Sequence, residues 1–181
     1  MINTNLILNV YKNKSSKSAL STQLLYGEKF QIVKKFRKFI KIKTTYDKYS
    51  GYIKNEKFEE NFTPTHKISS LSASLYSKPN KKFKLKNKIS FCSLVKITNK
   101  KKNFVNFGKY WVNKKDVLPI KKKISLFSKI KNFKNTKYKW GGNSFKGIDC
   151  SALVQIFYKF NNTFCPRDSK DQMKYFRKNV K

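Results

Sequence analysis

Short apolar runs separated by polar turns fill the first third of the chain and constrain its fold more than any other feature. With their flanking residues, these runs form stretches of about four to six positions with a two-residue period. The runs are Leu24–Tyr26, Phe30–Val33, Phe39–Ile42 and Gly51–Ile53. A two-residue period broken by glycine, lysine or aspartate indicates strands joined by hairpins. We therefore expect residues 1–62 to form a small β-barrel.

A second β-rich stretch follows a connector at Thr63–His66. Its apolar runs are Leu75–Ser77, Ile89–Phe91, Leu94–Ile97, Phe104–Phe107 and Tyr110–Val112. The two stretches are similar in length and in the order of their runs. This similarity favours an internal duplication and predicts a second small β-barrel at residues 63–120.

The pattern changes to a helical spacing after residue 121. Ile124, Phe127 and Ile130 are three residues apart, which predicts a helix over 122–134. A glycine-containing loop at Trp140–Ser144 then leads to a second predicted helix at Asp149–Phe160. Its predicted buried stripe consists of Leu153, Val154, Phe157 and Phe160. With 39% hydrophobic residues the chain can form packed cores, and we expect an α+β fold.

The chain is strongly basic, with a formal net charge of +34. Only Arg37, Arg167 and Arg177 are arginines, although surfaces that recognise bases or bind phosphates through two hydrogen bonds favour arginine. The lysines are spread along the whole sequence, which is typical of a solvated surface. We therefore expect no specific nucleic-acid binding, but weak, salt-sensitive adhesion to anionic polymers.

The three cysteines, Cys92, Cys150 and Cys165, are odd in number and lack CxxC spacing. This argues against a disulfide framework and against a zinc site, and we expect no metal or other cofactor. The N-terminus has no basic start followed by an apolar run, and no segment reaches the length of a membrane span. We interpret the chain as cytoplasmic.

Cys150 lies where a glycine-rich loop turns into the second predicted helix. A cysteine in the first turn of a helix is near the positive end of the helix dipole, which favours the nucleophilic thiolate. Asp149 can cap that helix. The alternative is that Cys150 is only a small buried hydrophobe. The glycine pair and the polar neighbours Asp149 and Ser151 favour the nucleophile, whereas Cys92 and Cys165 lack such a setting and are interpreted as core residues.

The segment Tyr138–Gln155, followed by Cys165–Ser169 and Gln172, resembles the opening of the NlpC/P60 cysteine peptidase domain. In that family a Tyr-x-Trp-Gly-Gly loop precedes an Asp-Cys-Ser helix and a Pro-Arg-x-Ser segment. Upstream, Ser21–Glu28 and the Thr65–His66 pair resemble the tandem bacterial SH3-like domains that precede this peptidase in some cytoplasmic cell-wall-recycling enzymes. The resemblance implies two SH3-like barrels followed by the helical part of a papain-like domain.

The resemblance also implies roles for individual residues. Cys150 would be the nucleophile that cleaves the bond between γ-D-glutamate and diaminopimelate (or lysine) in murein peptides. Asp149 and Ser151 would bind the free amino end of a substrate such as L-Ala-γ-D-Glu-diaminopimelate, and the Tyr138 hydroxyl would lie near the developing oxyanion.

In relatives the first SH3-like domain forms one wall of the cleft and helps to recognise the free amine of the substrate. This makes Glu28 and Tyr49 further candidates for substrate binding. The alternatives are that Glu28 is a turn residue beside Gly27 and that Tyr49 packs on a strand.

A papain-like mechanism also requires a base and a group that orients it. In the family both follow the part that this sequence resembles, and no histidine follows Cys150 here. His66 precedes Cys150, and we expect it to form hydrogen bonds in the connector rather than to act as the base. We therefore expect residues 121–181 to be an incomplete peptidase domain. Either the chain is a fragment or ends prematurely, or another chain supplies the rest; we favour the first, and we expect no activity from the chain as written.

Two other functions compete with the peptidase. The first is a non-catalytic module in which the SH3-like domains bind cell-wall peptides, so that loss of Cys150 changes little. The second is a basic protein that binds nucleic acid or another anionic polymer, with an affinity that falls steeply with salt.

Overall fold

Two five-stranded antiparallel sheets form most of the computed structural model, which describes residues 1–58 and 62–179. The first sheet contains β1 (Ile7–Tyr11), β2 (Leu20–Leu25), β3 (Phe30–Lys35), β4 (Phe39–Thr44) and β5 (Ser50–Lys54). Its strand order is β2-β1-β5-β4-β3. The four strands predicted between residues 24 and 53 are confirmed, and β1 is additional.

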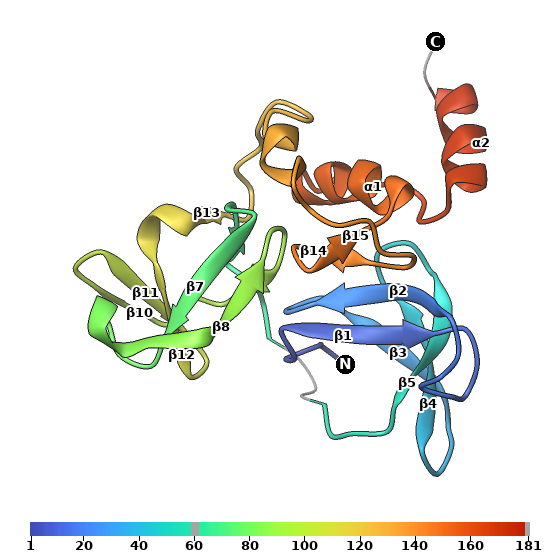
Figure 1. Cartoon of the computed structure of the whole chain (residues 1–181), viewed down its shortest axis with the longest axis horizontal. Coiled ribbons are helices and arrows are strands. Elements are labelled where there is room, and N and C mark those ends of the chain that lie inside the picture. The colour runs from blue at the N-terminus through green and yellow to red at the C-terminus, as the bar shows by residue number, and fades with distance from the viewer. Residues whose placement is uncertain (59–61, 180–181) are drawn as a thin grey trace.

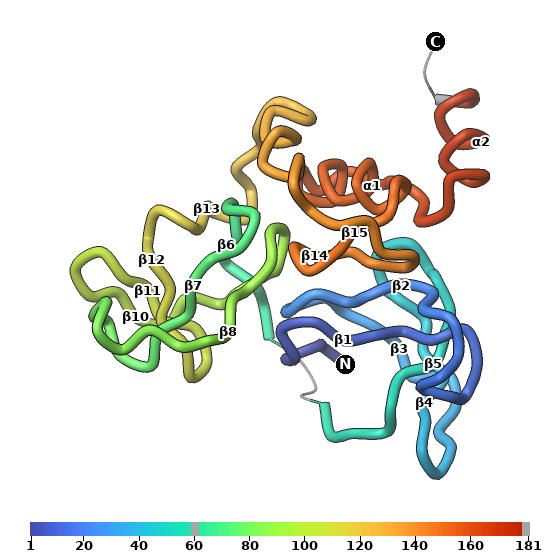
Figure 2. Tube along the Cα trace, viewed as in Figure 1, coloured from blue at the N-terminus to red at the C-terminus, as the bar shows by residue number. Residues whose placement is uncertain are grey.

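The second sheet contains β7 (Ser72–Tyr76), β8 (Lys84–Ser90), β10 (Asn99–Lys101), β11 (Phe104–Phe107) and β12 (Tyr110–Asn113). Its strand order is β10-β11-β12-β7-β8. When the five strands of this sheet are numbered in chain order and the sheet is read from the β8 edge, the order is 2-1-5-4-3, as in the first sheet. The two sheets therefore share one connectivity, as the similar run order led us to expect. They lie side by side in Figure 1, and the chain trace in Figure 2 passes from one to the other.

A smaller sheet of β6 (His66–Ile68), β9 (Leu94–Val95) and β13 (Val117–Pro119) completes the second unit. His66 was predicted to lie in the connector, but it begins β6 and pairs with Val95 and Pro119. Short 3-10 helices occur at η1 (Lys81–Phe83) and η2 (Lys114–Asp116). The domain boundaries at 62/63 and 120/121 stay a prediction.

The helix predicted over 122–134 is wrong. Only a 3-10 turn, η3 (Ile130–Phe133), forms there, and Phe127 has a positive φ of 63° that interrupts any helix. The apolar side chains are nevertheless used, because Phe133 is buried and Ile124 and Phe127 pack beside it. The segment therefore contributes to the core as irregular chain.

The helix predicted from Asp149 is confirmed as α1 (Cys150–Phe160), with Asp149 as its N-cap. Its buried face is centred on Ala152, Ile156 and Phe160, which are four residues apart. Phe157 is buried as predicted, whereas Leu153 and Val154 lie at the edges and are only half-buried, so that part of the predicted stripe is wrong. The hairpin β14 (Asn143–Ser144) and β15 (Gly147–Ile148) precedes α1, and α2 (Ser169–Asn179) follows it.

A shared apolar core holds α1 against both β units. Phe91 from the second unit stacks on Phe160 with 4.6 Å between ring centroids, and Leu25 of β2 belongs to the same cluster. Lys67 of β6 is fully buried and donates from Nζ to the Phe160 carbonyl at the end of α1. Each large apolar side chain buried here stabilises the assembly by about 1.5–3 kcal/mol. The helix α1 is therefore fixed relative to both β units.

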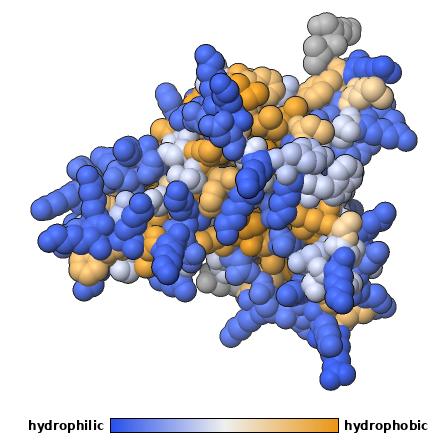
Figure 3. Space-filling view, in the orientation of Figure 1, coloured by the Kyte–Doolittle hydropathy of each residue, from blue (hydrophilic) through white to orange (hydrophobic). Residues whose placement is uncertain are grey.

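The fold is α+β, with mostly β-structure and two α-helices in the described residues. In Figure 3 hydrophilic side chains cover the outer ends of the two β units, and hydrophobic surface gathers between them. None of the helices in residues 1–58 and 62–179 has the length and apolar character needed to span a membrane.

Candidate active site

Cys150 is the first residue of α1 and its side chain is exposed. The preceding residue, Asp149, has extended backbone angles and accepts a hydrogen bond from the Ala152 amide at 2.8 Å, as an N-cap does. The β14–β15 hairpin and a bridge between Tyr138 and Ile148 bring the glycine loop to the same point. The sequence therefore presents a thiol at a capped helix start, as predicted.

A cleft of about 650 Å³ opens beside Cys150. The C-terminal part of the chain lines it with Tyr138, Trp140, Gly141, Asp149, Cys150, Ser151, Arg167, Asp168 and Ser169. The first unit lines it with Lys12, Ala19, Leu20, Ser21, Tyr49 and Ser50. The first unit therefore forms one wall of the cleft, and we refer to the whole as the Cys150 cleft.

Asp149 is held in a dense set of hydrogen bonds, and only 7% of its surface is exposed. Arg167 binds its carboxylate through both terminal nitrogens, at 3.0 Å to Oδ1 and 2.6 Å to Oδ2. The Gly141 amide donates to Oδ2 at 2.9 Å, and the Ser151 hydroxyl lies 3.2 Å from Oδ1. Every side of the carboxylate therefore already has a partner within the protein.

The electrostatics agree with this geometry. Burial disfavours the charged form of Asp149, but hydrogen bonds from Arg167 and the Ala152 amide outweigh it and lower the pKa of the carboxyl. Ser151 is also engaged, because its hydroxyl accepts from Arg167 at 2.9 Å. Asp149 and Ser151 lie at the site as predicted, but they hold the loop and helix together here. Their predicted contact with a substrate amine stays a prediction.

Arg167 is the main residue of the site to which sequence analysis assigned no role. Besides Asp149 and Ser151, it contacts the first unit, where its Nε donates to the Thr22 hydroxyl at 2.9 Å. Gln172 of α2 extends this support, because its amide donates to the Ser151 and Pro166 carbonyls. The signal was present in the sequence, since Arg167 is one of only three arginines and arginine is suited to bidentate pairing with a carboxylate.

Tyr49 and Asp168 lie together on the wall of the cleft. The Tyr49 hydroxyl donates to Asp168 Oδ1 at 3.3 Å, which joins the first unit to the segment before α2. Burial, and then the neighbouring carboxylate, raise the pKa of the Tyr49 hydroxyl to about 12. Asp168 is exposed and has far fewer partners than Asp149. It therefore presents negative charge to the cleft.

Tyr138 and Trp140 are among the most exposed aromatic side chains, at 65% and 71%. Both line the Cys150 cleft. Exposed rings on a cleft can pack against a bound molecule. The structure thus brings Tyr138 to the cleft, and its proposed contact with an oxyanion stays a prediction.

Two family models match the chain. Residues 135–181 match the NlpC/P60 family, and residues 10–58 match the bacterial dipeptidyl-peptidase Sh3 domain. The first match contains Cys150 and every residue bonded to Asp149. The match confirms the resemblance of Tyr138–Gln155 to this family. This family consists of cysteine peptidases that act on cell-wall peptides.

Solved structures also align with the chain. A crystal structure of an NlpC/P60 family protein from Bacillus cereus ATCC 10987 superimposes with a TM-score of 0.79 at 19% identity, over 96% of this chain and 76% of that one. NlpC2 from Trichomonas vaginalis aligns at 18% identity over 94% and 69% of the two chains, with a TM-score of 0.36. The search of curated proteins gave no match. The chain therefore shares the fold of the Bacillus cereus protein over most of its length.

Glu28 does not lie in the Cys150 cleft. It lines a separate cavity of about 370 Å³ between the first unit and α1. Its carboxylate accepts from the Leu25 amide and from Lys159 Nζ, each at 2.6 Å. Of the two substrate candidates in the first unit, the structure thus brings Tyr49 to Cys150 but leaves Glu28 in an internal ion pair.

His66 also lies outside the Cys150 cleft, which no histidine of the described residues lines. Its Nδ1 is 2.9 Å from the Thr65 hydroxyl, and its pKa is lowered by burial and by Lys100. It is the one histidine of the sequence. This placement agrees with the expectation that His66 forms hydrogen bonds locally and does not act as the base.

Cys92 and Cys165 are buried, which confirms that they are core residues. Burial raises the pKa of the Cys92 thiol to about 12 and that of the Cys165 thiol to about 11.

Because the thiolate is the reactive form, we expect iodoacetamide to modify exposed Cys150 at least about a hundredfold faster than either Cys92 or Cys165. Mass spectrometry of partly alkylated, folded protein measures this. Protein unfolded in denaturant is the control, in which the three cysteines should react at similar rates. Rapid modification of Cys165 in folded protein would contradict the prediction.

Proposed function

We propose that this chain provides the nucleophile and the substrate cleft of a cysteine peptidase that cleaves the bond between γ-D-glutamate and a diamino acid in murein peptides. The observation that carries the proposal is exposed Cys150 at the capped start of α1, inside the segment that matches NlpC/P60. Recycling of such peptides in the cytoplasm is part of the same proposal.

The chemistry follows from the thiol. The Cys150 thiolate attacks the γ-carbonyl carbon, the amino group of the diamino acid leaves with a proton, and water then hydrolyses the thioester. The start of α1 directs the positive end of its dipole at the developing negative charge. A base must take the thiol proton, and no histidine of the described residues is in the cleft. We therefore expect turnover only where a further segment or chain supplies that base.

Asp168, rather than Asp149, is the better candidate to bind the free amine of the substrate. The Asp149 carboxylate is saturated by Arg167, Gly141 and Ala152. Asp168 is exposed on the cleft wall with the Tyr49 hydroxyl beside it. A carboxylate that still has free acceptor positions can pair with an ammonium group.

Binding and turnover can be tested separately. L-Ala-γ-D-Glu-diaminopimelate should protect Cys150 of residues 1–181 from iodoacetamide, and its N-acetylated form should protect less. For turnover, residues 1–181 are extended with the C-terminal part of an NlpC/P60 peptidase domain. Cys150→Ala should then lower the rate at least about a thousandfold, whereas Cys165→Ala, which removes a thiol outside the cleft, should retain activity. Absence of both protection and Cys150-dependent turnover would reject the proposal.

Asp168→Asn gives a sharper prediction about the amine. Loss of a charged hydrogen bond costs about 1.5–3 kcal/mol, so protection of Cys150 should require about 10–100-fold more of the free-amine peptide. Protection by the N-acetylated peptide should change little. The control is Asp171→Asn, because Asp171 is an exposed carboxylate three residues away that does not line the cleft. Equal losses with both peptides would assign Asp168 a structural role.

A non-catalytic module that binds cell-wall peptides is the second candidate. The position of His66 outside the Cys150 cleft favours it. In that case the peptide would bind residues 1–181 with the same affinity in wild type and Cys150→Ala, and addition of a C-terminal part would produce no turnover. Isothermal titration of both variants measures this.

A further inference from the structure

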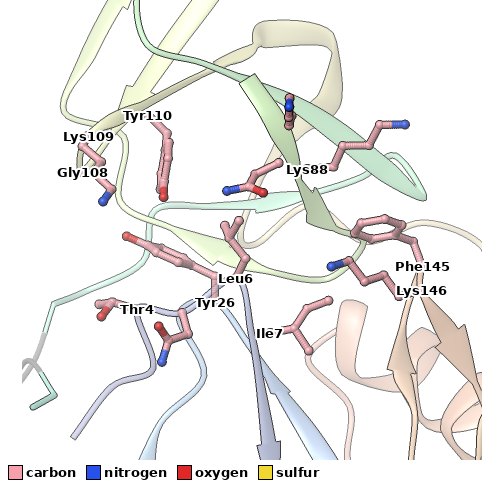
Figure 4. Close-up of a pocket in the computed structure, with 13 residues that line it drawn as sticks. Thr4, Leu6, Ile7, Tyr26, Lys88, Gly108, Lys109, Tyr110, Phe145 and Lys146 are labelled. Atoms are coloured by element: carbon pink, nitrogen blue, oxygen red, sulfur yellow. The ribbon is translucent and has the colours of Figure 1, made fainter. Parts of the chain in front are cut away.

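A second cleft, of about 880 Å³, lies on a different part of the molecule from Cys150. Three parts of the chain form it: the segment before β1, the second sheet, and the β14–β15 hairpin. Four lysines line it, Lys86, Lys88, Lys109 and Lys146, and we call it the lysine cleft. Figure 4 shows Lys88, Lys109 and Lys146 at its edges.

The charge of the lysine cleft has one sign. All four lysines are exposed, and no carboxylate is among the described residues that line the cleft. Glu56 approaches its edge, where it accepts a hydrogen bond from Asn5. The Cys150 cleft, in contrast, contains both Asp149 and Asp168. A concave surface with one sign of charge concentrates the field and attracts ligands of the opposite charge.

The floor of the lysine cleft is apolar and aromatic. Figure 4 shows Tyr26 and Leu6 of the first unit facing Tyr110 of the second, with Phe145 approaching from the hairpin. Tyr110 and Phe145 are half-buried, so each ring still has exposed surface. The Tyr26 ring is fixed by edge contact with Phe107, with 5.3 Å between centroids. A ligand that alternates anionic and apolar groups would match both surfaces.

The positions of the lysines favour a chain-like anion over a single ion. Lys86 and Lys88 both lie on β8, at the irregularity in its pairing with β7. Figure 4 shows Lys88, Lys109 and Lys146 at separate edges of the cleft, so the charges do not converge on one point. Lysine binds phosphate as a point charge without the fork of arginine, and this suits recognition without sequence preference.

We propose that the lysine cleft binds a flexible phosphodiester chain, with phosphates on its lysines and the intervening groups on its apolar floor. Positive grooves with exposed rings bind single-stranded nucleic acid in this manner. A phosphodiester polymer without bases presents the same backbone chemistry. The site is separate from Cys150 and does not depend on the proposed peptidase function.

The test compares two variants of equal charge. The cleft variant is Lys86→Gln/Lys88→Gln/Lys146→Gln. The control variant is Lys35→Gln/Lys38→Gln/Lys43→Gln, which removes three exposed lysines from the β3–β4 hairpin, outside the described clefts. The probe is a fluorescein-labelled oligothymidylate about twelve nucleotides long, and binding is followed by anisotropy over a range of salt concentrations.

We expect the cleft variant to bind at least about tenfold more weakly at moderate salt, with its salt slope reduced by about 2 because three phosphate contacts are lost. The control variant should lose less than about threefold. Equal losses in both would show that net charge alone drives binding and would overturn the proposal. An abasic oligomer identifies the source of the phosphodiester chain. If it binds as tightly as the oligothymidylate, the ligand is a polymer without bases. If it binds more weakly, and Phe145→Leu further weakens binding of the oligothymidylate, the ligand is nucleic acid.

Two measurements keep the test independent of variant folding. In wild-type protein the bound oligomer should protect Lys86, Lys88 and Lys146 from acetylation more than Lys35, Lys38 and Lys43, as read by mass spectrometry. Poly-glutamate of matched length and charge should compete at least about tenfold less well than the oligomer. Uniform protection of all lysines, or equal competition by poly-glutamate, would contradict a phosphodiester site.

Discussion

Replacing Arg167 with methionine is expected to lower the free energy of unfolding by about 3–5 kcal/mol, because it leaves the buried Asp149 carboxylate without its counter-charge. Arg167 provides two of the hydrogen bonds to that carboxylate and a third to Thr22 of the first unit. Methionine keeps the length and apolar stem of the side chain, so the loss reports mainly on the charge. Denaturant unfolding followed by circular dichroism measures it.

Two further variants separate the ion pair from other effects. Arg177→Met removes an exposed arginine from α2 and should change stability by less than about 0.5 kcal/mol. The double variant Asp149→Asn/Arg167→Met should recover much of the lost stability, because asparagine can still cap α1 but carries no charge. No recovery in the double variant would contradict the explanation.

The pH dependence of Arg167→Met follows from the lowered pKa of Asp149. A carboxyl with a lowered pKa in the folded state adds stability above its unfolded pKa, about 3.9, and that stability is lost as the pH falls through the folded pKa. Without Arg167, burial disfavours the charged form. The stability difference between wild type and Arg167→Met should therefore be largest near neutral pH and shrink below about pH 4.

The strands that sequence analysis found are those with apolar side chains of their own. β4, with Phe39, Ile40 and Ile42, shows its buried positions directly in its sequence. β10 is Asn-Lys-Lys and entirely exposed, so only its pairing with β11 makes it a strand. Such edge strands depend on a partner that local sequence does not reveal.

The helix predicted at 122–134 is wrong for the opposite reason. An apolar spacing alone does not exclude an irregular backbone, such as the positive φ at Phe127.

The site could be predicted as far as its local geometry reaches. Cys150, its N-cap Asp149 and the glycine loop are consecutive in sequence, so a helix start with an exposed thiol was foreseeable. The partner of Asp149 is 18 residues away in Arg167. Nothing local shows that this arginine already occupies the carboxylate. Choosing between Asp149 and Asp168 as the acid open to a ligand therefore required the three-dimensional structure.

Gly141→Ala is expected to cost about 2–5 kcal/mol, the sum of a left-handed backbone penalty and overpacking. Gly141 has a φ of 68°, and an added Cβ would lie 2.4 Å from the Leu20 carbonyl oxygen of the first unit. The Gly141 amide also donates to Asp149. The loop must therefore move, and this should change the alkylation rate of Cys150 as well as the stability.

Gly108→Ala is the matched control for this contact. Gly108 also has a positive φ, 50°, but the nearest atom to its added Cβ is the Tyr26 hydroxyl at 3.4 Å. It should therefore cost only the backbone penalty, about 1–2 kcal/mol, and leave the Cys150 alkylation rate unchanged. If both variants lost the same stability, close packing against Leu20 would not be what holds the glycine loop beside Cys150. If Gly141→Ala alone also alters the thiol, the wall formed by the first unit is what positions Cys150.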